Sequence, residues 1–223
     1  MRTDATYVAP EALNSVRDYI SKEFGESYLP EKPKFFGSTN KNAQEAHECI
    51  RPTDVSRTPA KVAKALDPDQ LKLYTLIYNR FVSCQMSDAK WDSTTVTFKR
   101  SDKETGATLK ATGRVLAFDG FYRVAGVPTA SDEQTLPKLA EGDESAPFSV
   151  EPIQKFTSPP ARYNEGSLVK KLEEEGIGRP STYASIIKVI QDRNYVEKIT
   201  NRFHATDLGE VVTDKLLEGF EQI

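Results

Sequence analysis

The turn GIGRPSTY at residues 176–183 carries the sharpest chemical signal in this sequence. Pro180 suits the first turn of a helix, and Ser181 and Thr182 place hydroxyls where the first amides of that helix lack partners. Beside the forked guanidinium of Arg179, such a helix start is a natural phosphate site, because the dipole, free amides and a cation converge there. The alternative is a well-capped corner between two helices, and the pattern alone leaves both open.

The motif HECIRPT, which begins at His47, is the second chemical feature. His47 and Arg51 are four residues apart, so we expect them to share a helix face, with Gln44 and Glu48 nearby. A histidine and an arginine on one face would suit an anionic substrate. The alternative is a surface or purely structural histidine, and that is the reading we give His204, an expected strand residue.

Motifs of several other chemistries do not occur in the sequence. It has no G-x-S-x-G elbow, no G-x-x-x-x-G-K-[ST] loop, no H-E-x-x-H pair and no aspartate cluster with Mg²⁺-site spacing. Two cysteines and two histidines exclude a disulfide scaffold and a four-cysteine zinc site, and their spacing is wrong for a mixed zinc site. Without a long apolar run, the chain is expected to be reduced and cytoplasmic.

Composition describes a polar chain that can still fold. The 223 residues have room for one or two domains, and 30 basic against 33 acidic residues give a formal net charge of −3, unlike a histone-like binder. Residues 51–100 hold nine basic and five acidic residues, whereas residues 131–161 hold two and six. A basic face can therefore coexist with net acidity, although both regions can equally be ordinary solvated faces.

Helical patterns predominate over residues 1–90. Gly25 follows the first apolar stripe as a stop signal, and Pro52 ends a short helical turn expected over residues 43–50. The other expected helices begin at Pro10, Pro59 and Pro68. The stripe that we expect the last of these to bury consists of Leu71, Tyr74, Ile77, Phe81 and Val82.

The middle of the chain has a β-rich texture. Alternating apolar and polar residues predict two strands joined by a turn that contains glycine, and the pattern continues after them. An acidic stretch over residues 129–147 is expected to be a loop. The expected strands are residues 94–100, 108–118, 120–127 and 148–156.

From Arg162 onward the helical texture returns. Asn164 can cap a helix that stops at Gly176, and a second helix should begin at Pro180. A hairpin over residues 194–206 and a final helix, capped by Thr206 or Asp207, complete the order of a winged helix-turn-helix. The expected buried residues of the second helix are Ile186, Ile187 and Ile190.

Taken together, these motifs resemble the bacterial type IA DNA topoisomerases. MRTDATYVAPEAL resembles the stretch that follows the active-site tyrosine of that family, and AQEAHECIRPT resembles its His-Glu-Ala-Ile-Arg-Pro-Thr block, with Cys49 in place of alanine. LYTLIYNRFVSCQMSDAKWDSTTVTF resembles the helix and strand that lead out of the tyrosine-bearing domain. The most specific block is PPARYNEGSLVKKLEEEGIGRPSTYASIIKVIQDRNYV. The likeness is co-linear and covers essentially all of the chain.

The resemblance implies an ATP-independent isomerase that relaxes negatively supercoiled DNA. A tyrosine attacks a phosphodiester in single-stranded DNA, forms a 5′-phosphotyrosyl link, and another strand passes before the break is resealed. A phenol has a pKa near 10, so the attack needs positive charge to favour the phenolate and balance the phosphorane. The family also uses Mg²⁺, bound by an acidic domain that this chain does not resemble, so we expect no metal ligands here.

The resemblance assigns roles to individual residues. Arg2 is similar to the arginine that contacts the scissile phosphate, and His47 to the histidine associated with DNA binding and the active conformation. Arg179 and Thr182 match the residues that approach DNA near the scissile site. The expected catalytic residues are Arg2 and His47. The expected DNA-binding residues are Arg51, Arg162, Arg179, Ser181 and Thr182.

One departure from the family concerns the nucleophile. The tyrosine's position would be the residue before Met1, and Tyr7 lies on the wrong side of the motif, with Ala5 where the family has serine. We therefore expect an internal piece of a longer enzyme that binds single-stranded DNA weakly and does not cleave it. Its partners would be single-stranded and negatively supercoiled DNA and the parent's remaining domains, in the bacterial cytoplasm and nucleoid, with no membrane.

The expected fold class is multi-domain α+β, in which helical segments flank a small β-rich segment. Residues 1–87 resemble the distal part of the tyrosine-bearing gate domain, residues 88–160 one arm of the β-rich hinge domain, and residues 161–223 a partial, winged-helix-like DNA-binding domain. Unpaired strand edges are expected in the hinge arm. The alternative function is a non-catalytic winged-helix protein that binds or regulates nucleic acid, with a preference for duplex.

Overall fold

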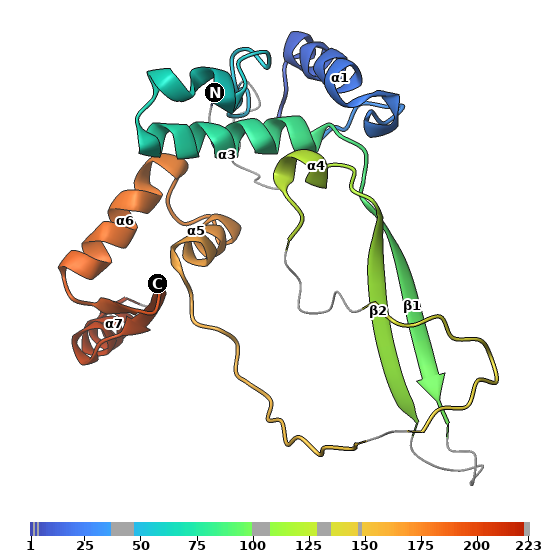
Figure 1. Cartoon of the computed structure of the whole chain (residues 1–223). Coiled ribbons are helices and arrows are strands. Elements are labelled where there is room, and N and C mark those ends of the chain that lie inside the picture. Colours follow the sequence, from blue (N-terminus) through green and yellow to red (C-terminus); the bar gives the residue numbers. More distant parts are fainter. Residues whose placement is uncertain are drawn as a thin grey trace. The chain divides into compact units, whose positions relative to one another are not determined.

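The computed structural model describes residues 1, 3, 5–36, 47–99, 108–128, 135–146 and 149–220. The chain divides into two compact units (Figure 1). The N-terminal unit comprises Met1–Gly37 and Glu45–Pro147, and the C-terminal unit comprises Ser38–Gln44 and Phe148–Ile223. Seven α-helices and two small antiparallel sheets among the described residues confirm the α+β class. The division into three domains stays a prediction.

Helix α1 spans Pro10–Phe24 and begins and ends where the sequence predicts. Pro10 occupies the first helical position, where a missing N–H removes nothing, and Gly25 leaves the helix with a φ of 95°. The apolar stripe of this helix faces the core of the N-terminal unit. Its buried residues are Ala12, Leu13, Val16 and Ile20.

Helix α3 spans Pro68–Cys84 and packs beside α1 (Figure 1). Asp67 and Gln70 form a capping box at its start. Its buried face differs from the predicted stripe, since Tyr78 is buried and its neighbour Ile77 only half-buried. Tyr78 can be buried because its hydroxyl donates to the carbonyl of Val55 over 2.9 Å. The core residues shared with α1 are Val55, Tyr78, Phe81, Val82 and Met86.

Short helical pieces connect these two helices. A 3₁₀ turn, Glu26–Tyr28, follows α1, and α2 (Pro59–Val62) with a 3₁₀ turn over Ala63–Ala65 precedes α3. The predicted helix start at Pro59 is therefore confirmed, in two short segments.

A long two-stranded ribbon follows α3 in the N-terminal unit (Figure 1). Strand β1 (Lys90–Phe98) pairs antiparallel with β2 (Leu109–Phe118), which confirms both predicted strands. The guanidinium of Arg114 lies 4.4 Å from the ring centre of Trp91, a cation–π contact across the two strands.

The predicted strand over residues 120–127 is wrong. The chain turns into a single helical turn, α4 (Tyr122–Ala125), because Gly120 adopts a φ of +50° against the backbone of Asp88. A Cβ at Gly120 would lie 2.6 Å from that backbone, so the tight turn requires glycine. The amide of Phe121 then donates to the carbonyl of Ser87 over 2.9 Å, which directs the chain back towards the end of α3.

The predicted strand over residues 148–156 is also wrong for the part that the structure describes. Residues 149–160 contain neither helix nor strand. Val150, Ile153 and Phe156 are 78%, 73% and 80% exposed, so this stretch lacks the partner strand that a β-ladder needs. Residues 135–146 form the predicted loop.

The C-terminal unit has the predicted order of elements. Asn164 caps α5 (Glu165–Glu174), and Thr206, not Asp207, caps the final helix, α7 (Asp207–Gly219). Between them lie α6 (Pro180–Asp192), β3 (Val196–Ile199) and β4 (Arg202–Ala205). Helix α6 buries Tyr183 and Ile187, whereas Ile186 and Ile190 are only half-buried. The winged-helix likeness stays a prediction.

Candidate nucleic-acid interface

The predicted site residues fall into two groups, one in each unit. His47 and Arg51 lie in the N-terminal unit. Arg2 lies outside the described residues. The second group, Arg162, Arg179, Ser181 and Thr182, belongs to the C-terminal unit.

The His47 segment is not helical where the structure describes it, so the shared helix face of His47 and Arg51 is wrong. The amide of Cys49 instead donates to the carbonyl of Tyr7 over 2.8 Å. This long-range backbone pairing replaces the helical hydrogen bonds that the local pattern predicted. The N-terminal motif is MRTDAT, residues 1–6. The bond joins Tyr7, which directly follows this motif, to the histidine motif that begins at His47. Gln44 lies outside the described residues.

Arg51 is held by Glu48 at the edge of this segment. Its Nη2 donates to Glu48 Oε2 over 3.0 Å, and its Nη1 donates to the carbonyl of Pro52 over 3.0 Å. The side chains of Arg51 and Glu48 are only 16% and 22% exposed. The hydrogen bond from Arg51, and then the amide of Ala9, lower the pKa of the Glu48 carboxyl. Much of the Arg51 charge is therefore balanced within the chain.

His47 has a buried ring nitrogen, Nδ1. Its Nδ1 is excluded from solvent and makes no hydrogen bond to the part of the chain that the structure describes. Buried polar atoms are normally paired, so the unpaired Nδ1 distinguishes His47 within this segment. Two residues after His47, burial raises the pKa of the Cys49 thiol, which makes Cys49 a poor nucleophile.

Arg179 and Thr182 together close the first turn of α6. The Thr182 hydroxyl accepts a hydrogen bond from the Arg179 amide over 2.8 Å. The amides of Thr182 and Tyr183 in turn donate hydrogen bonds to the Arg179 carbonyl. Among the described residues, the first-turn amide of Ser181 has no such acceptor. Arg179, Ser181 and Thr182 are all exposed. The Thr182 hydroxyl also donates to the Arg179 carbonyl over 3.0 Å, and Arg179 Nη1 donates to the Gly178 carbonyl over 2.6 Å. An anion approaching this corner would therefore meet the Ser181 amide and hydroxyl and the rest of the exposed Arg179 guanidinium.

Two glycines shape the turn in front of α6. Gly176 and Gly178 have φ values of +72° and +76°, which favour glycine. A Cβ on Gly178 would lie 3.1 Å from side-chain atoms of Tyr183 and Ile186, whereas one on Gly176 would meet nothing within 4 Å. Only Gly178 is therefore needed for close approach of the backbone to α6.

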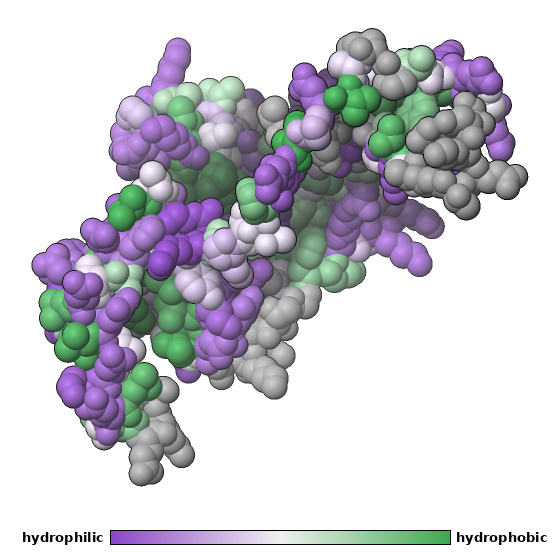
Figure 2. All heavy atoms as spheres, turned by 90° about the horizontal axis from the view of Figure 1, so that it is seen from below, coloured by the Kyte–Doolittle hydropathy of each residue, from purple (hydrophilic) through white to green (hydrophobic). Residues whose placement is uncertain are grey.

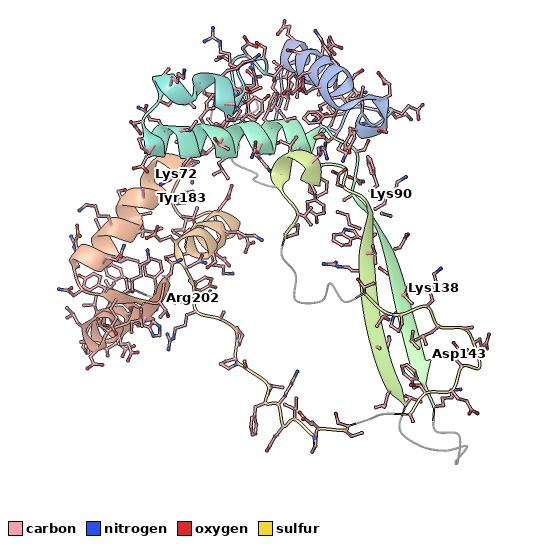
Figure 3. All side chains as sticks on the ribbon, in the orientation of Figure 1. Lys72, Lys90, Lys138, Asp143, Tyr183 and Arg202 are labelled. Atoms are coloured by element: carbon pink, nitrogen blue, oxygen red, sulfur yellow. The ribbon has the colours of Figure 1, made fainter. Side chains whose placement is uncertain are left out.

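Arg162 lies in the segment that leads into α5, where it is tied to the hairpin. Arg202 Nη1 donates to the carbonyl of Arg162 over 2.7 Å (Figure 3 labels Arg202), and the amide of Phe203 donates to the carbonyl of Tyr163 over 2.8 Å. No local pattern in the sequence indicates that Arg202 is a neighbour of Arg162. Only pairing between the hairpin and the stretch before Asn164 reveals it.

The fold and these two groups define an α+β protein whose candidate site residues carry basic or hydroxyl side chains. The family model of DNA topoisomerase (Topoisom_bac) matches residues 1–223, and the chain belongs to this family. The predicted resemblance to bacterial type IA topoisomerases is therefore confirmed.

Individual bacterial topoisomerases are similar in sequence to this chain along its whole length. DNA topoisomerase 1 of Vibrio cholerae is 51% identical over 223 residues, and that of Escherichia coli K12 is 50% identical over 224. Both alignments cover all of this chain but 25% of the relative, so the chain spans about a quarter of their length. The solved full-length topoisomerase I of Thermotoga maritima aligns with a TM-score of 0.79 and 37% identity, over 100% of this chain and 35% of that one.

Proposed function

We propose that this chain forms part of the DNA-binding and gate region of a type IA DNA topoisomerase. The parent enzyme would relax negatively supercoiled DNA in the bacterial cytoplasm, by single-strand cleavage through a 5′-phosphotyrosine and strand passage. The observation that carries the DNA-binding role is the exposed start of α6, where Arg179, Ser181 and Thr182 converge.

The two groups of residues would have different tasks. Arg179, Ser181 and Thr182 would hold a backbone phosphate of single-stranded DNA, with Arg162 as a further cation near the same unit's hairpin. Arg2 and His47 would stabilise charge at the scissile phosphate. Arg51 remains a proposed DNA contact, although Glu48 already holds its guanidinium.

We further propose that the 223 residues alone bind single-stranded DNA weakly and do not cleave it. Several tyrosines have structural environments that disfavour a phenolate: the bond to Asp119 raises the pKa of Tyr28, and burial raises the pKa of Tyr74 and Tyr78. A supercoiled-plasmid assay with Mg²⁺ tests this, with a full-length relative as the positive control. Relaxation by the chain alone would overturn the proposed inactivity.

Magnesium belongs to the proposed activity of the parent enzyme, where it would offset phosphate charge. Within the described ranges, no three His, Cys, Asp or Glu side chains come together as a metal site. We therefore assign no metal ligand to these residues and derive no step of the reaction from the ion.

The remaining domains of the parent are the proposed protein partners. Helix α7 exposes Leu208, Val211 and Leu217, and Phe220 directly after the helix is also exposed. Hydrophobic residues interrupt the hydrophilic surface in Figure 2. Apolar area of this kind is usually covered by further protein. None of the described helices is long and apolar enough to cross a membrane.

The order α5, α6, β3, β4, α7 also supports the second candidate, a winged-helix protein that binds duplex DNA. Competition between single-stranded and duplex oligonucleotides of the same sequence separates the two proposals. Preference for the single strand supports the topoisomerase role, and a clear preference for duplex supports the winged-helix role.

A further inference from the structure

We propose that Glu48 is a positioning residue that fastens the segment after the N-terminal motif to the His47 segment. This inference rests on the proposed function, because it assumes that both segments act on DNA. Glu48 itself need not touch DNA, since its carboxylate is already occupied by two donors from the chain. Its effect would reach DNA through the placement of His47 relative to the residues before Tyr7.

The first donor is the amide at the start of α1. Ala9 is the N-cap of this helix and has no side-chain acceptor, and Ala12 stands where a capping box would have Glu or Gln. Glu48 Oε1 accepts the Ala9 amide over 3.1 Å, from 39 residues away in sequence. The carboxylate thus takes the place of the missing capping-box acceptor for the Ala9 amide, and it brings a negative charge to the positive end of the helix dipole.

The second donor is Arg51, which orients the carboxylate. Both oxygens of Glu48 accept from the Arg51 guanidinium, and Arg51 is in turn anchored on the Pro52 carbonyl. A forked pair of this kind restricts the rotation of both side chains. Glu48 is therefore held in place before it caps α1.

The third connection is backbone pairing one residue further along. The Cys49 amide donates to the Tyr7 carbonyl over 2.8 Å. Two bonds, Ala9 to Glu48 and Cys49 to Tyr7, then join the segments side by side. Because His47 directly precedes Glu48, loss of the Glu48 bond should release His47 relative to the N-terminal motif.

The experiment tests whether removal of the Glu48 charge lowers the affinity for DNA, which is the opposite of what the change in charge alone would produce. Removing an acidic residue should strengthen binding to a polyanion by electrostatics, whereas loss of positioning should weaken it. The variant Glu48→Ala removes both the acceptor for the Ala9 amide and the ion pair with Arg51. The variant Glu48→Gln keeps an acceptor for the Ala9 amide but removes the negative charge. Asp69→Ala is the matched control, since Asp69 is an exposed acid of the same unit and its side chain is 93% exposed.

Binding of a fluorescent single-stranded oligonucleotide to the 223-residue chain is the first readout. We expect Glu48→Ala to bind about threefold to tenfold more weakly, Glu48→Gln to lie between it and the wild type, and Asp69→Ala to bind as well as or better than the wild type. Glu48→Ala should have little further effect in a His47→Ala background, because both changes remove the same contribution. Additive losses, or tighter binding by Glu48→Ala, would overturn the proposal.

Hydrogen exchange at the Ala9 and Cys49 amides is the second readout. Exchange at both should be about tenfold faster in Glu48→Ala and less affected in Glu48→Gln. Unchanged exchange would overturn the fastening role even if DNA binding fell. If the wild-type chain binds no oligonucleotide, the proposed function fails, while the exchange rates still decide whether Glu48 joins the segments. Should Glu48→Ala not fold, Glu48→Gln decides both readouts.

Discussion

The hydroxyl of Thr182 accepts a hydrogen bond from the backbone amide of Arg179 over 2.8 Å, while the side chain of Arg179 stays exposed at the surface. The pair therefore does two things at the start of α6. Its backbone and hydroxyl close the first helical turn, and its cation remains exposed to an incoming phosphate. Capping and phosphate binding, which the sequence presents as alternatives, are compatible in this geometry.

Replacement of Arg179 by alanine tests the phosphate contact. We expect about threefold to tenfold weaker binding of single-stranded DNA, with the slope of log affinity against log salt reduced by about 0.7, because one phosphate contact is lost. Fluorescence anisotropy over a salt series measures both quantities. Arg193→Ala is the control, since Arg193 is an exposed residue at the opposite end of α6. An equal loss in both variants would point to general charge and not to the α6 start.

The two turn glycines should differ in their sensitivity to alanine. Gly176→Ala meets no atoms and should cost about 1 kcal/mol for its positive φ, whereas Gly178→Ala also crowds Tyr183 and Ile186 and should cost about 2–3 kcal/mol. Urea denaturation followed by circular dichroism measures the difference. Gly166→Ala in α5, where the new Cβ makes only ordinary contact, should be neutral or stabilising by up to about 1 kcal/mol. Equal costs at 176 and 178 would contradict the crowding.

Acid should weaken the Glu48–Arg51 pair. The folded-state pKa of Glu48 lies below its ordinary value of 4.5, so the pair stabilises the fold above that value and loses its contribution as the pH falls through the folded pKa. Between pH 6 and 8 this contribution should stay constant. Thermal unfolding of the wild type and of Glu48→Gln from pH 7 to pH 3 tests the direction of this pH dependence. The difference in stability between the two proteins should shrink on acidification. A difference that grows towards low pH would contradict it.

Two tyrosines allow a matched test of buried hydrogen bonding. The hydroxyl of Tyr78 donates to Val55 in the core, whereas that of Tyr74 donates to the carbonyl of Arg57 at the surface over 2.7 Å. Tyr78→Phe leaves a buried carbonyl without its partner and should cost about 1–3 kcal/mol, while water can replace the bond in Tyr74→Phe, which should cost below about 1 kcal/mol. Chemical denaturation of both variants provides the comparison. A larger cost at Tyr74 would argue against the burial of the Tyr78 bond.

Local signals predicted those elements whose ends are decided within a few residues. Pro10 and Gly25 bound α1, Asp67 caps α3 and Asn164 caps α5 as the sequence indicates, because a cap bonds to amides two or three positions away. The same local reasoning failed at His47–Ile50 and at residues 120–127. In both places backbone bonds to distant residues, Cys49 to Tyr7 and Phe121 to Ser87, override the local preference.

The sequence by itself determined the family, the two hairpins and the starts of α1, α3, α5 and α6, since motifs and caps are local. Only the tertiary structure decided that Glu48 caps α1 from a distant segment. It also explains Gly209, a poor helix former inside α7, where a Cβ would lie 2.1 Å from the carbonyl oxygen of Tyr195. Contacts of this kind depend on two segments meeting in space, and no pattern of neighbouring residues specifies where they meet.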